Sequence, residues 1–161
     1  MNVNIQYLHE KKALGTAGAL GCLPNKPNLP FIVMNSDILT NINIQHLLDF
    51  HRANRAKATM CVKNYHFQVP FGVVETDQYK VKRIDEKPVH RFFVNAGIYV
   101  IEPEVLDLIP DDTRFDMTSL FEVIIEKGYE TAVFPIREYW MDIGKLDDYN
   151  LANGDYEKIF K

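Results

Sequence analysis

The stretch from Glu10 to Asp37 constrains the fold most, because it joins a run of small residues to an apolar segment that leads to a carboxylate. Its first half, Lys12–Leu20, predicts a turn that feeds a helix whose opening positions are small, so a flat ligand can lie against bare backbone. Its second half, Phe31–Met34, predicts a short strand buried on both faces of a parallel sheet. Ligands of open α/β sheets bind at the carboxyl ends of strands, so Asp37 is a candidate site residue.

The apolar pattern along the chain alternates between helix and strand periods, which predicts an α/β fold with a mixed, mostly parallel, Rossmann-like sheet flanked by helices. Helices are expected at Ala17–Leu23 with Thr16 as N-cap, after the N-caps Asn43 and Asp116, and over Leu146–Phe160. Strands are expected at Asn4–Leu8, Phe31–Met34, Ala58–Lys63, Phe71–Glu75, Lys80–Asp85, Phe92–Ile101, Thr131–Phe134 and Glu138–Met141. The pair Phe71–Glu75 and Lys80–Asp85 is expected to form a hairpin.

Composition narrows the class of protein. With 161 residues, of which 47% are hydrophobic, the chain suits one packed, soluble domain. The net charge of -4 and the scattered basic residues give no general attraction for nucleic acid. No apolar run approaches the roughly 20 residues of a membrane span, and no signal segment is found, so we expect a cytoplasmic protein without a membrane partner. Cys22 and Cys61 are expected to be buried thiols.

Two aspartates follow apolar strands and are candidate magnesium ligands. Asp37 and Asp142 are far apart in sequence, but two carboxylates at strand ends can converge on one hard cation. Mg²⁺ is commonly held by one or two carboxylates while substrate phosphates complete its shell. A strand-end aspartate also serves commonly as a helix cap or a turn residue, and spacing alone leaves both interpretations open.

Other polar and small residues are candidates for a sugar phosphate site. Lys87 is suited to a ligand phosphate and Glu86 to sugar hydroxyls, although Glu86-Lys87-Pro88 by itself is more typical of a solvated turn. Gly72 and Asn95-Ala96-Gly97 permit close backbone approach to a sugar or mark a bulge. Trp140 is suited to a pocket wall or to the core. The histidines have no metal-ligand pairing and receive no role: His9, His46, His51, His66 and His90.

The glycines of Gly15–Gly21 do not match a dinucleotide-binding fingerprint. That fingerprint requires glycines at its first, third and sixth positions directly after a strand. An NAD-dependent oxidoreductase therefore has little support.

Six motifs in order resemble the sugar-phosphate nucleotidyltransferases over essentially the full chain. They are Leu14–Gly18, Asn35–Leu39, Phe71–Glu75, Glu86–Pro88, Val94–Tyr99 and Trp140–Lys145. The chain is most similar to the glucose-1-phosphate thymidylyltransferase and mannose-1-phosphate guanylyltransferase branches. The resemblance implies that a sugar-1-phosphate attacks the α-phosphorus of GTP or dTTP, which yields a nucleotide-sugar and pyrophosphate. Such transfer depends mostly on positioning and charge stabilisation.

The resemblance also implies a role for each candidate residue. Asp37, Lys87 and Asp142 form the catalytic set, in which the two aspartates hold Mg²⁺ and Lys87 contacts the sugar phosphate. The residues implied to line the base and ribose are Leu14, Gly15, Thr16, Ala17 and Gly18. Those implied to face the sugar are Gly72, Glu86, Asn95, Gly97 and Trp140.

The chain departs from the family at its front, where members carry a glycine-rich loop that wraps the triphosphate. No segment matches this loop, and Asn4–Leu8 corresponds to the family's third strand. Residues 1–161 are therefore expected to form a partial domain with open backbone edges, inactive and of doubtful stability as an isolated chain. A homo-oligomer or a partner chain is expected to cover the open sheet. The alternative is a noncatalytic sugar-nucleotide-binding or regulatory module that pairs with a partner.

Overall fold

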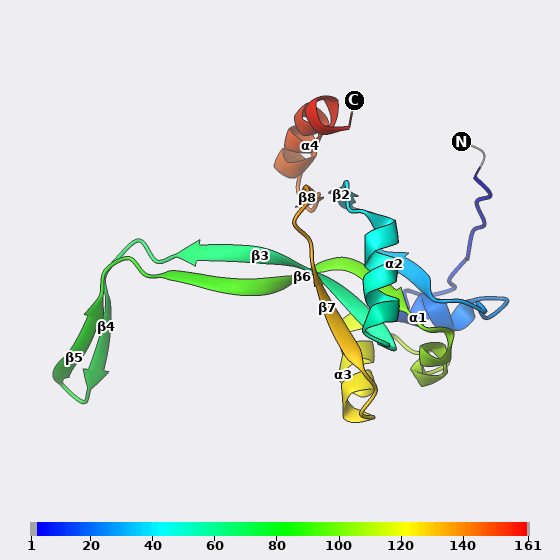
Figure 1. Ribbon diagram of the computed structural model, residues 1–161, viewed down its shortest axis with the longest axis horizontal. Coiled ribbons are helices and arrows are strands. Elements are labelled where there is room, and N and C mark those ends of the chain that lie inside the picture. Colours follow the sequence, from blue (N-terminus) through cyan, green and yellow to red (C-terminus); the bar gives the residue numbers. More distant parts are fainter. Residues whose placement is uncertain (1–2, 161) are drawn as a thin grey trace.

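The computed structural model describes residues 3–160 and centres on a four-stranded mixed sheet (Figure 1). In spatial order, its strands are β1 (Phe31–Met34), β6 (Val89–Ile101), β3 (Ala58–Gln68) and β7 (Thr131–Pro135). β6 pairs antiparallel with both β1 and β3, whereas β3 and β7 are parallel, so within this sheet β6 runs against the other strands. The mixed sheet with flanking helices confirms the predicted α/β class.

The C-terminal half of β6 supplies side chains to two hydrophobic cores, one on each face of the sheet. Alternate residues of a strand point to opposite faces, and here nearly all of them are buried. One core packs against α3 (Met117–Glu126) and includes Tyr99, Ile101, Leu120 and Ile124. The other packs against α2 (Ile44–Ala53) and includes Leu47, Cys61, Ile98 and Val100. Burial on both faces explains why this part of β6 is an apolar run.

The later helices begin and end close to the predicted residues. Asn43 caps α2, because its side chain accepts a hydrogen bond from the backbone N–H of His46 at 3.0 Å. α3 follows Asp116 and ends before Gly128, which has φ +71°. The other segments are α4 (Leu146–Ile159) and a short 3₁₀ helix, η2 (Pro103–Leu108). Among residues 3–160, no helix is both long and apolar enough to cross a membrane.

The first helix differs from its prediction. Instead of a helix over Ala17–Leu23 with Thr16 as its N-cap, the chain forms α1 (Gly15–Gly18) and then a 3₁₀ turn, η1 (Ala19–Cys22). The helix begins earlier because Gly15 adopts φ +80°, a conformation that glycine allows at little cost. Thr16 therefore lies inside α1, and Leu14 occupies the N-cap position without a side-chain hydrogen bond.

Two very short strands form a separate pair. β2 (Ile38–Thr40) pairs antiparallel with β8 (Trp140–Asp142), with Ile38 opposite Asp142. β2 was not predicted, and β8 begins two residues after the expected start at Glu138. The pairing joins residues about one hundred positions apart, so no local sequence pattern predicts it.

A long two-stranded arm extends away from the body of the molecule (Figure 1). It consists of the C-terminal half of β3 and the N-terminal half of β6. Both strands are longer than predicted. Beyond it lies the predicted hairpin of β4 (Val73–Asp77) and β5 (Lys80–Asp85), which is confirmed. Every residue of β4 is exposed, so the hairpin stands in solvent rather than against the core.

Three predictions of burial or strand structure were wrong. Asn4–Leu8 forms no strand, and its Tyr7 side chain is 92% exposed. β1 is not buried on both faces: its first three residues are partly buried and Met34 is exposed, because in residues 3–160 only β6 pairs with it. Cys22 is exposed. Cys61 is buried as predicted, and burial raises the pKa of its thiol to about 12.

Candidate functional site

The segment Leu14–Gly18 packs against the loop that precedes α3. The backbone N–H groups of Ala17 and Gly18 donate to the Phe115 carbonyl at 3.0 and 2.9 Å, and Phe115 N–H donates to the Leu14 carbonyl at 2.8 Å. A Cβ on Gly15 would lie 2.8 Å from the Phe115 carbonyl oxygen. The small residues here are therefore required for packing within the protein, in addition to any ligand that they contact.

Thr16 and Asp116 exchange hydrogen bonds between α1 and α3. The Thr16 hydroxyl accepts from the backbone N–H of Met117 at 2.8 Å, so it satisfies the first turn of α3. The Asp116 carboxylate accepts from the backbone N–H of Thr16 at 3.1 Å and does not bond to its own helix. The predicted capping role of Asp116 is thus corrected: the side chain caps α1, and Thr16 caps α3.

A cleft of about 310 Å³ lies where α1 meets the end of β1. Its lining residues are Thr16, Val33, Met34, Asn35, Ser36 and Asp37. Of the five residues predicted to contact the base and ribose, only Thr16 is among them, whereas Leu14 and Ala17 are buried in the protein. None of the lining residues is basic. The cleft joins the two halves of the stretch that the sequence singled out.

Asp37 and Asp142 lie one position apart across the β2–β8 ladder. Ile38, next to Asp37, is opposite Asp142, and the backbone N–H of Ile143 donates to the Asp37 carbonyl at 2.7 Å. Both aspartates are exposed. Within residues 3–160, no group of three or more His, Cys, Asp or Glu side chains is arranged to hold a metal ion. A pair of hard oxygen donors fits Mg²⁺ that is also bound by substrate phosphates.

Gly97 and Trp140 lie close to the β2–β8 pair, and Asn95 bonds the backbone at Gly97. Gly97 has φ +67°, and its backbone bonds the end of β1, because Asn35 N–H donates to the Gly97 carbonyl at 2.9 Å. Asn95 Oδ1 accepts from Gly97 N–H at 2.9 Å, and the Trp140 indole N–H donates to the Ala96 carbonyl at 2.9 Å. Asn35, which lines the cleft and contacts Gly97, was missed as a site residue, although it directly follows the predicted strand.

The remaining predicted residues form a second group at the far end of the arm. Glu86 lies beside Gly72, where a Cβ would be 3.0 Å from the Glu86 carboxylate, and Lys87 follows with φ +46°. Val62 pairs with Asn95 at the base of the arm, and Gln68 pairs with Val89 at its end. At about 3.3 Å per residue, roughly 20 Å of strand separates the two groups. The structure therefore does not bring Lys87 next to Asp37 and Asp142.

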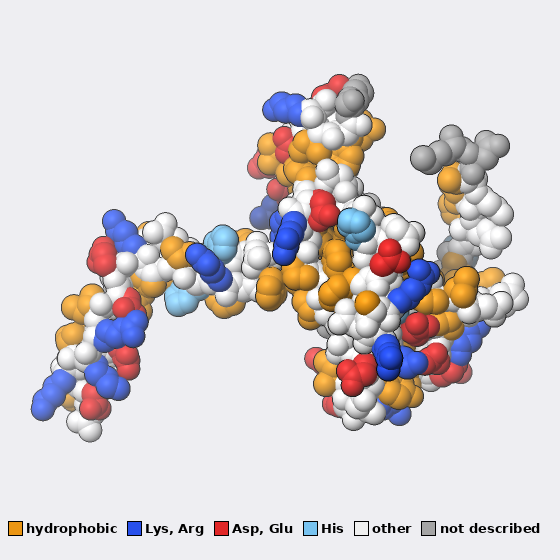
Figure 2. Space-filling view, in the orientation of Figure 1, with side chains coloured by type: hydrophobic (Ala, Val, Ile, Leu, Met, Phe, Trp, Pro, Cys, Tyr) orange, Lys and Arg blue, Asp and Glu red, His pale blue; other side chains and the backbone are white. Residues whose placement is uncertain are grey.

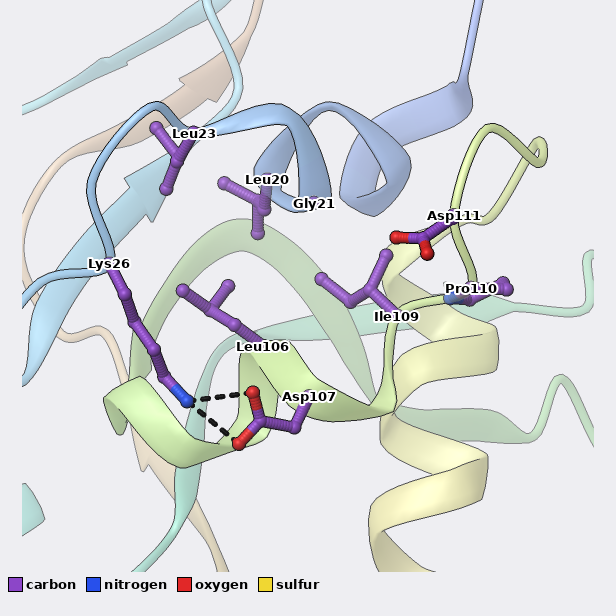
Figure 3. Close-up of a pocket in the computed structure, with 9 residues that line it drawn as sticks. All are labelled: Leu20, Gly21, Leu23, Lys26, Leu106, Asp107, Ile109, Pro110 and Asp111. Atoms are coloured by element: carbon purple, nitrogen blue, oxygen red, sulfur yellow. Dashed lines mark hydrogen bonds and ion pairs between the residues drawn. The ribbon is translucent and has the colours of Figure 1, made fainter.

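A larger hollow, of about 450 Å³, lies between η1 and η2 (Figure 3). Leu20, Leu106 and Ile109 form its apolar part, and Lys26 spans it to the Asp107 carboxylate with contacts of 2.8 and 2.7 Å. None of the predicted site residues lines it. We therefore place the candidate site at the smaller cleft beside Asp37.

Comparison with known proteins identifies a family. The family model described as nucleotidyl transferase matches residues 1–159. A probable mannose-1-phosphate guanylyltransferase 3 of Arabidopsis thaliana is 34% identical over 158 residues, which cover 92% of this chain and 47% of that protein. A mannose-1-phosphate guanyltransferase of Saccharomyces cerevisiae is 34% identical over 157 residues, which cover 91% of this chain and 43% of that protein.

Solved structures share the fold. The crystal structure of a putative glucose-1-phosphate thymidylyltransferase from Bacillus anthracis matches with a TM-score of 0.67 and 22% identity, over 93% of this chain and 64% of that one. HddC from Yersinia pseudotuberculosis, in a crystal structure with GMP-PN, matches with a TM-score of 0.62 and 19% identity, over 91% of this chain and 64% of that one.

The chain belongs to the nucleotidyl transferase family, and the relatives named above are sugar-1-phosphate nucleotidyltransferases. It spans a little under half the length of those curated relatives.

Proposed function

We propose that this chain carries the base- and sugar-facing part of an enzyme that makes a nucleotide-sugar and pyrophosphate from a nucleoside triphosphate and a sugar-1-phosphate. The observation that carries the proposal is the position of Asp37, which lines the cleft between α1 and β1 and lies one ladder position from Asp142 across the β2–β8 pair. This geometry suits a ligand whose phosphates bridge a metal ion and the protein.

GTP and mannose-1-phosphate are the substrates that we favour. The relatives at 34% identity are named as mannose-1-phosphate guanylyltransferases, which supports guanylyl transfer over thymidylyl transfer. The thymidylyltransferase from Bacillus anthracis supports only the shared fold. In this proposal, the base and ribose lie against the Leu14–Gly18 segment, with Thr16 as its exposed contact in the cleft.

The proposed cofactor is Mg²⁺, held by Asp37 and Asp142 together with substrate phosphate oxygens. When bound, the ion would neutralise charge on the phosphates during transfer. The chain's own residues orient the reactants. Asn95 and Gly97 shape the turn against which Asn35 of the cleft is bonded, and the Trp140 ring is fixed as a wall because its N–H is bonded to the Ala96 carbonyl.

The proposed sugar phosphate contacts of Lys87, Glu86 and Gly72 require a change in the arm. These residues lie roughly 20 Å along the strands from Asn95. The β3–β6 register shifts between Met60 and Val62 at the base of the arm, which is a place where two strands can bend. A bend there in the direction of the cleft would shorten the distance between the Lys87 ammonium and Asp37.

We propose that residues 1–161 alone bind the nucleotide but do not turn it over. The residues that line the cleft include no lysine or arginine, whereas transfer of a nucleotidyl group requires cationic stabilisation of the triphosphate. The same observation favours one alternative: a noncatalytic module that binds a sugar nucleotide and pairs with a partner chain. The enzyme and the noncatalytic module are both expected to bind a sugar nucleotide. They differ in whether a partner chain restores turnover.

Two measurements test the proposal. Pyrophosphate release is measured with the purified chain, Mg²⁺, GTP and mannose-1-phosphate, and we expect none above background. Calorimetric titration with GDP-mannose, dTDP-glucose and UDP-glucose is expected to give binding that is tightest for GDP-mannose. Binding of none of the three would contradict the proposed site, and robust pyrophosphate release would contradict the claim that further cationic residues are needed.

A further inference from the structure

One face of the arm continues the face of the sheet on which the cleft lies. Asn95, at the base of the arm, donates a hydrogen bond from its side-chain amide to the Tyr99 hydroxyl at 2.8 Å. Tyr99 belongs to the core beneath α3, and Val33, which lines the cleft, packs against the same core. The Asn95 side chain therefore points to the side of the sheet that carries the cleft.

Four further side chains share this face of the arm. Alternate residues of a strand point to the same face, and so do directly paired residues of an antiparallel ladder. Counting back from Asn95, the face carries Phe93 and Arg91 on β6 and their partners Asn64 and His66 on β3. All four are exposed. We call these four residues the cationic strip.

The cationic strip holds two basic side chains without an acidic partner. His66 and Arg91 are directly opposite each other, and their side chains form no hydrogen bond or ion pair with another residue of the described range 3–160. On the neighbouring hairpin, by contrast, Lys82 pairs with Glu75 at 3.3 Å. Residues 61–70 and 87–95 contain no aspartate or glutamate, although the net charge of the chain is -4. Figure 2 shows basic and histidine side chains along the arm.

The opposite face of the arm differs because its basic groups are engaged. Lys63 donates to the Glu138 carbonyl at 2.7 Å, and the ring of His90 stacks on that of Phe92 with 6.2 Å between centroids. Both faces lack acidic residues, so this absence does not separate them. The two free donors opposite each other distinguish the cationic strip.

The two donors are placed to bind one phosphate group. The Cβ atoms of directly opposite residues in a ladder lie about 4.5–5.5 Å apart. The Arg91 guanidinium can therefore bind two oxygens of a phosphate while an N–H of the His66 ring donates to a third.

Phe93 adds a surface for a sugar ring beside this phosphate position. Its side chain is 58% exposed and lies two residues from Arg91 along β6, a separation of about 7 Å. The face of an aromatic ring carries partial negative charge and attracts C–H groups such as those of a sugar. A cationic pair next to an exposed ring therefore fits a sugar phosphate better than a free phosphate ion.

We propose that the cationic strip binds the sugar-1-phosphate, with the phosphate on Arg91 and His66 and the sugar ring against Phe93. This inference rests on the proposed function and names residues that lie outside the six motifs. The cleft has no basic lining residue, and the strip supplies two. Arg91 lies roughly 13 Å from Asn95 along β6, closer to that residue than Lys87 is.

The strip leads to the cleft at its inner end. Asn95 accepts a hydrogen bond from the backbone N–H of Gly97, whose carbonyl accepts from the N–H of the cleft residue Asn35. A sugar phosphate on the strip would thus be held on the same side of the sheet as the nucleotide in the cleft.

Calorimetric titration of mannose-1-phosphate and of inorganic phosphate into the purified chain, both without Mg²⁺, tests the strip. The wild type should bind mannose-1-phosphate more tightly than inorganic phosphate. Arg91→Gln should weaken both at least ~10-fold, because a bidentate charge-assisted contact is lost, and His66→Gln should also weaken both. Phe93→Leu should weaken mannose-1-phosphate about 3–10-fold and leave inorganic phosphate unchanged.

The matched control is His90→Gln, an exposed position on the opposite face of the same strand. It should retain both affinities, and the far-ultraviolet circular dichroism of all four variants should match the wild type. Equal weakening by His90→Gln and Arg91→Gln would overturn the proposal. Inorganic phosphate that binds the wild type as tightly as mannose-1-phosphate would overturn it as well.

A parallel titration of GTP with Mg²⁺ separates this inference from the proposed function. Arg91→Gln should retain the binding of GTP in the cleft. A wild-type chain that binds GTP but not mannose-1-phosphate would overturn the strip and leave the cleft standing. A wild-type chain that binds mannose-1-phosphate through Arg91 but does not bind GTP would support the strip and contradict the proposed nucleotide site.

Discussion

At the scale of single residues, α1 and α3 each rely on a side chain from the other. Thr16 accepts from Met117 N–H and Asp116 accepts from Thr16 N–H, so the two helix starts are fixed together. A cap that comes from a residue about one hundred positions away has no local sequence pattern. The exchange couples the cleft residue Thr16 to the core that α3 covers, so a change at the cleft is also a change in stability.

Replacement of Thr16 by alanine should lower the free energy of unfolding by about 1–2 kcal/mol, the usual cost of a lost helix cap. Thr16→Ser should retain most of the stability because the hydroxyl is kept. Thr118→Ala, at an exposed position on α3, is the matched control and should change stability by less than about 0.5 kcal/mol. Urea denaturation of the three variants measures these differences, and equal stability of Thr16→Ala and wild type would contradict the capping role.

His51 should make stability depend on pH. Its ring is 1% exposed and lies between the Thr59 hydroxyl at 2.7 Å and the Glu102 carboxylate at 3.3 Å. Burial lowers the pKa of His51, with smaller contributions from Arg52 and Lys57, although Glu102 acts in the opposite direction.

Because the folded-state pKa of His51 lies below its unfolded value, the folded state favours the neutral ring. This contribution to stability is complete above about pH 6.5 and is lost as the pH falls below that value toward the folded pKa. The midpoint of urea unfolding should therefore decrease on acidification through this window. His51→Leu should remove that part of the pH dependence, and an unchanged pH profile in this variant would show that other groups cause it.

At the scale of elements, two glycines in different surroundings should respond oppositely to the same substitution. Gly97 has φ +67°, and a Cβ there would lie 2.6 Å from Ile38 Cδ1 and 2.8 Å from Asn35 Nδ2. Gly97→Ala should destabilise the protein by about 2–4 kcal/mol through backbone strain and overpacking. Gly154 lies inside α4, where an added Cβ would meet no atom within 4 Å, and Gly154→Ala should stabilise by up to about 1 kcal/mol.

Thermal denaturation of both glycine variants, with the wild type as reference, measures these effects. Loss of sugar-nucleotide binding in Gly97→Ala, but not in Gly154→Ala, would further link the Asn95–Gly97 bend to the site. A neutral Gly97→Ala would show that the contact with Ile38 relaxes at no cost.

The sequence predicted the elements whose packing follows a single local period. α2, α3 and the body part of β6 were expected nearly within their bounds, because their apolar positions follow one helix face or one strand run. The pairing of β2 with β8 was missed, and Asn4–Leu8 was wrongly expected as a strand, because strand formation depends on a distant partner.

The candidate site was partly predictable for the same reason. The sequence marked Asp37 and Asp142 as strand-associated carboxylates. Their proximity results from the pairing of β2 with β8, which the spacing of residues along the sequence does not predict. Lys87 was grouped with them through the resemblance to the family, whereas the structure has it at the far end of the arm. Small residues at Gly15 and Gly18 were expected to admit a ligand, and they also admit the loop before α3.

At the scale of the whole molecule, a long two-stranded arm extends away from the body (Figure 1). The body holds two packed cores and the cleft beside Asp37. The chain matches the nucleotidyl transferase family over residues 1–159, while it spans a little under half the length of the curated relatives described above. β1 has a free edge within the described residues, and the arm exposes the side chains of Tyr65, Phe67 and Phe92.

The most direct test of the account is a calorimetric titration of GTP into the purified chain, with and without Mg²⁺. Binding should be tighter with Mg²⁺, and Asp37→Asn should remove at least ~10-fold of that enhancement, as expected for loss of a direct metal ligand. The matched control Asp111→Asn, at the separate hollow between η1 and η2, should retain the enhancement. GTP binding that is equally tight with and without Mg²⁺ would contradict a metal-assisted nucleotide site at Asp37 and Asp142. An equal loss of the Mg²⁺ enhancement in Asp37→Asn and Asp111→Asn would contradict it as well.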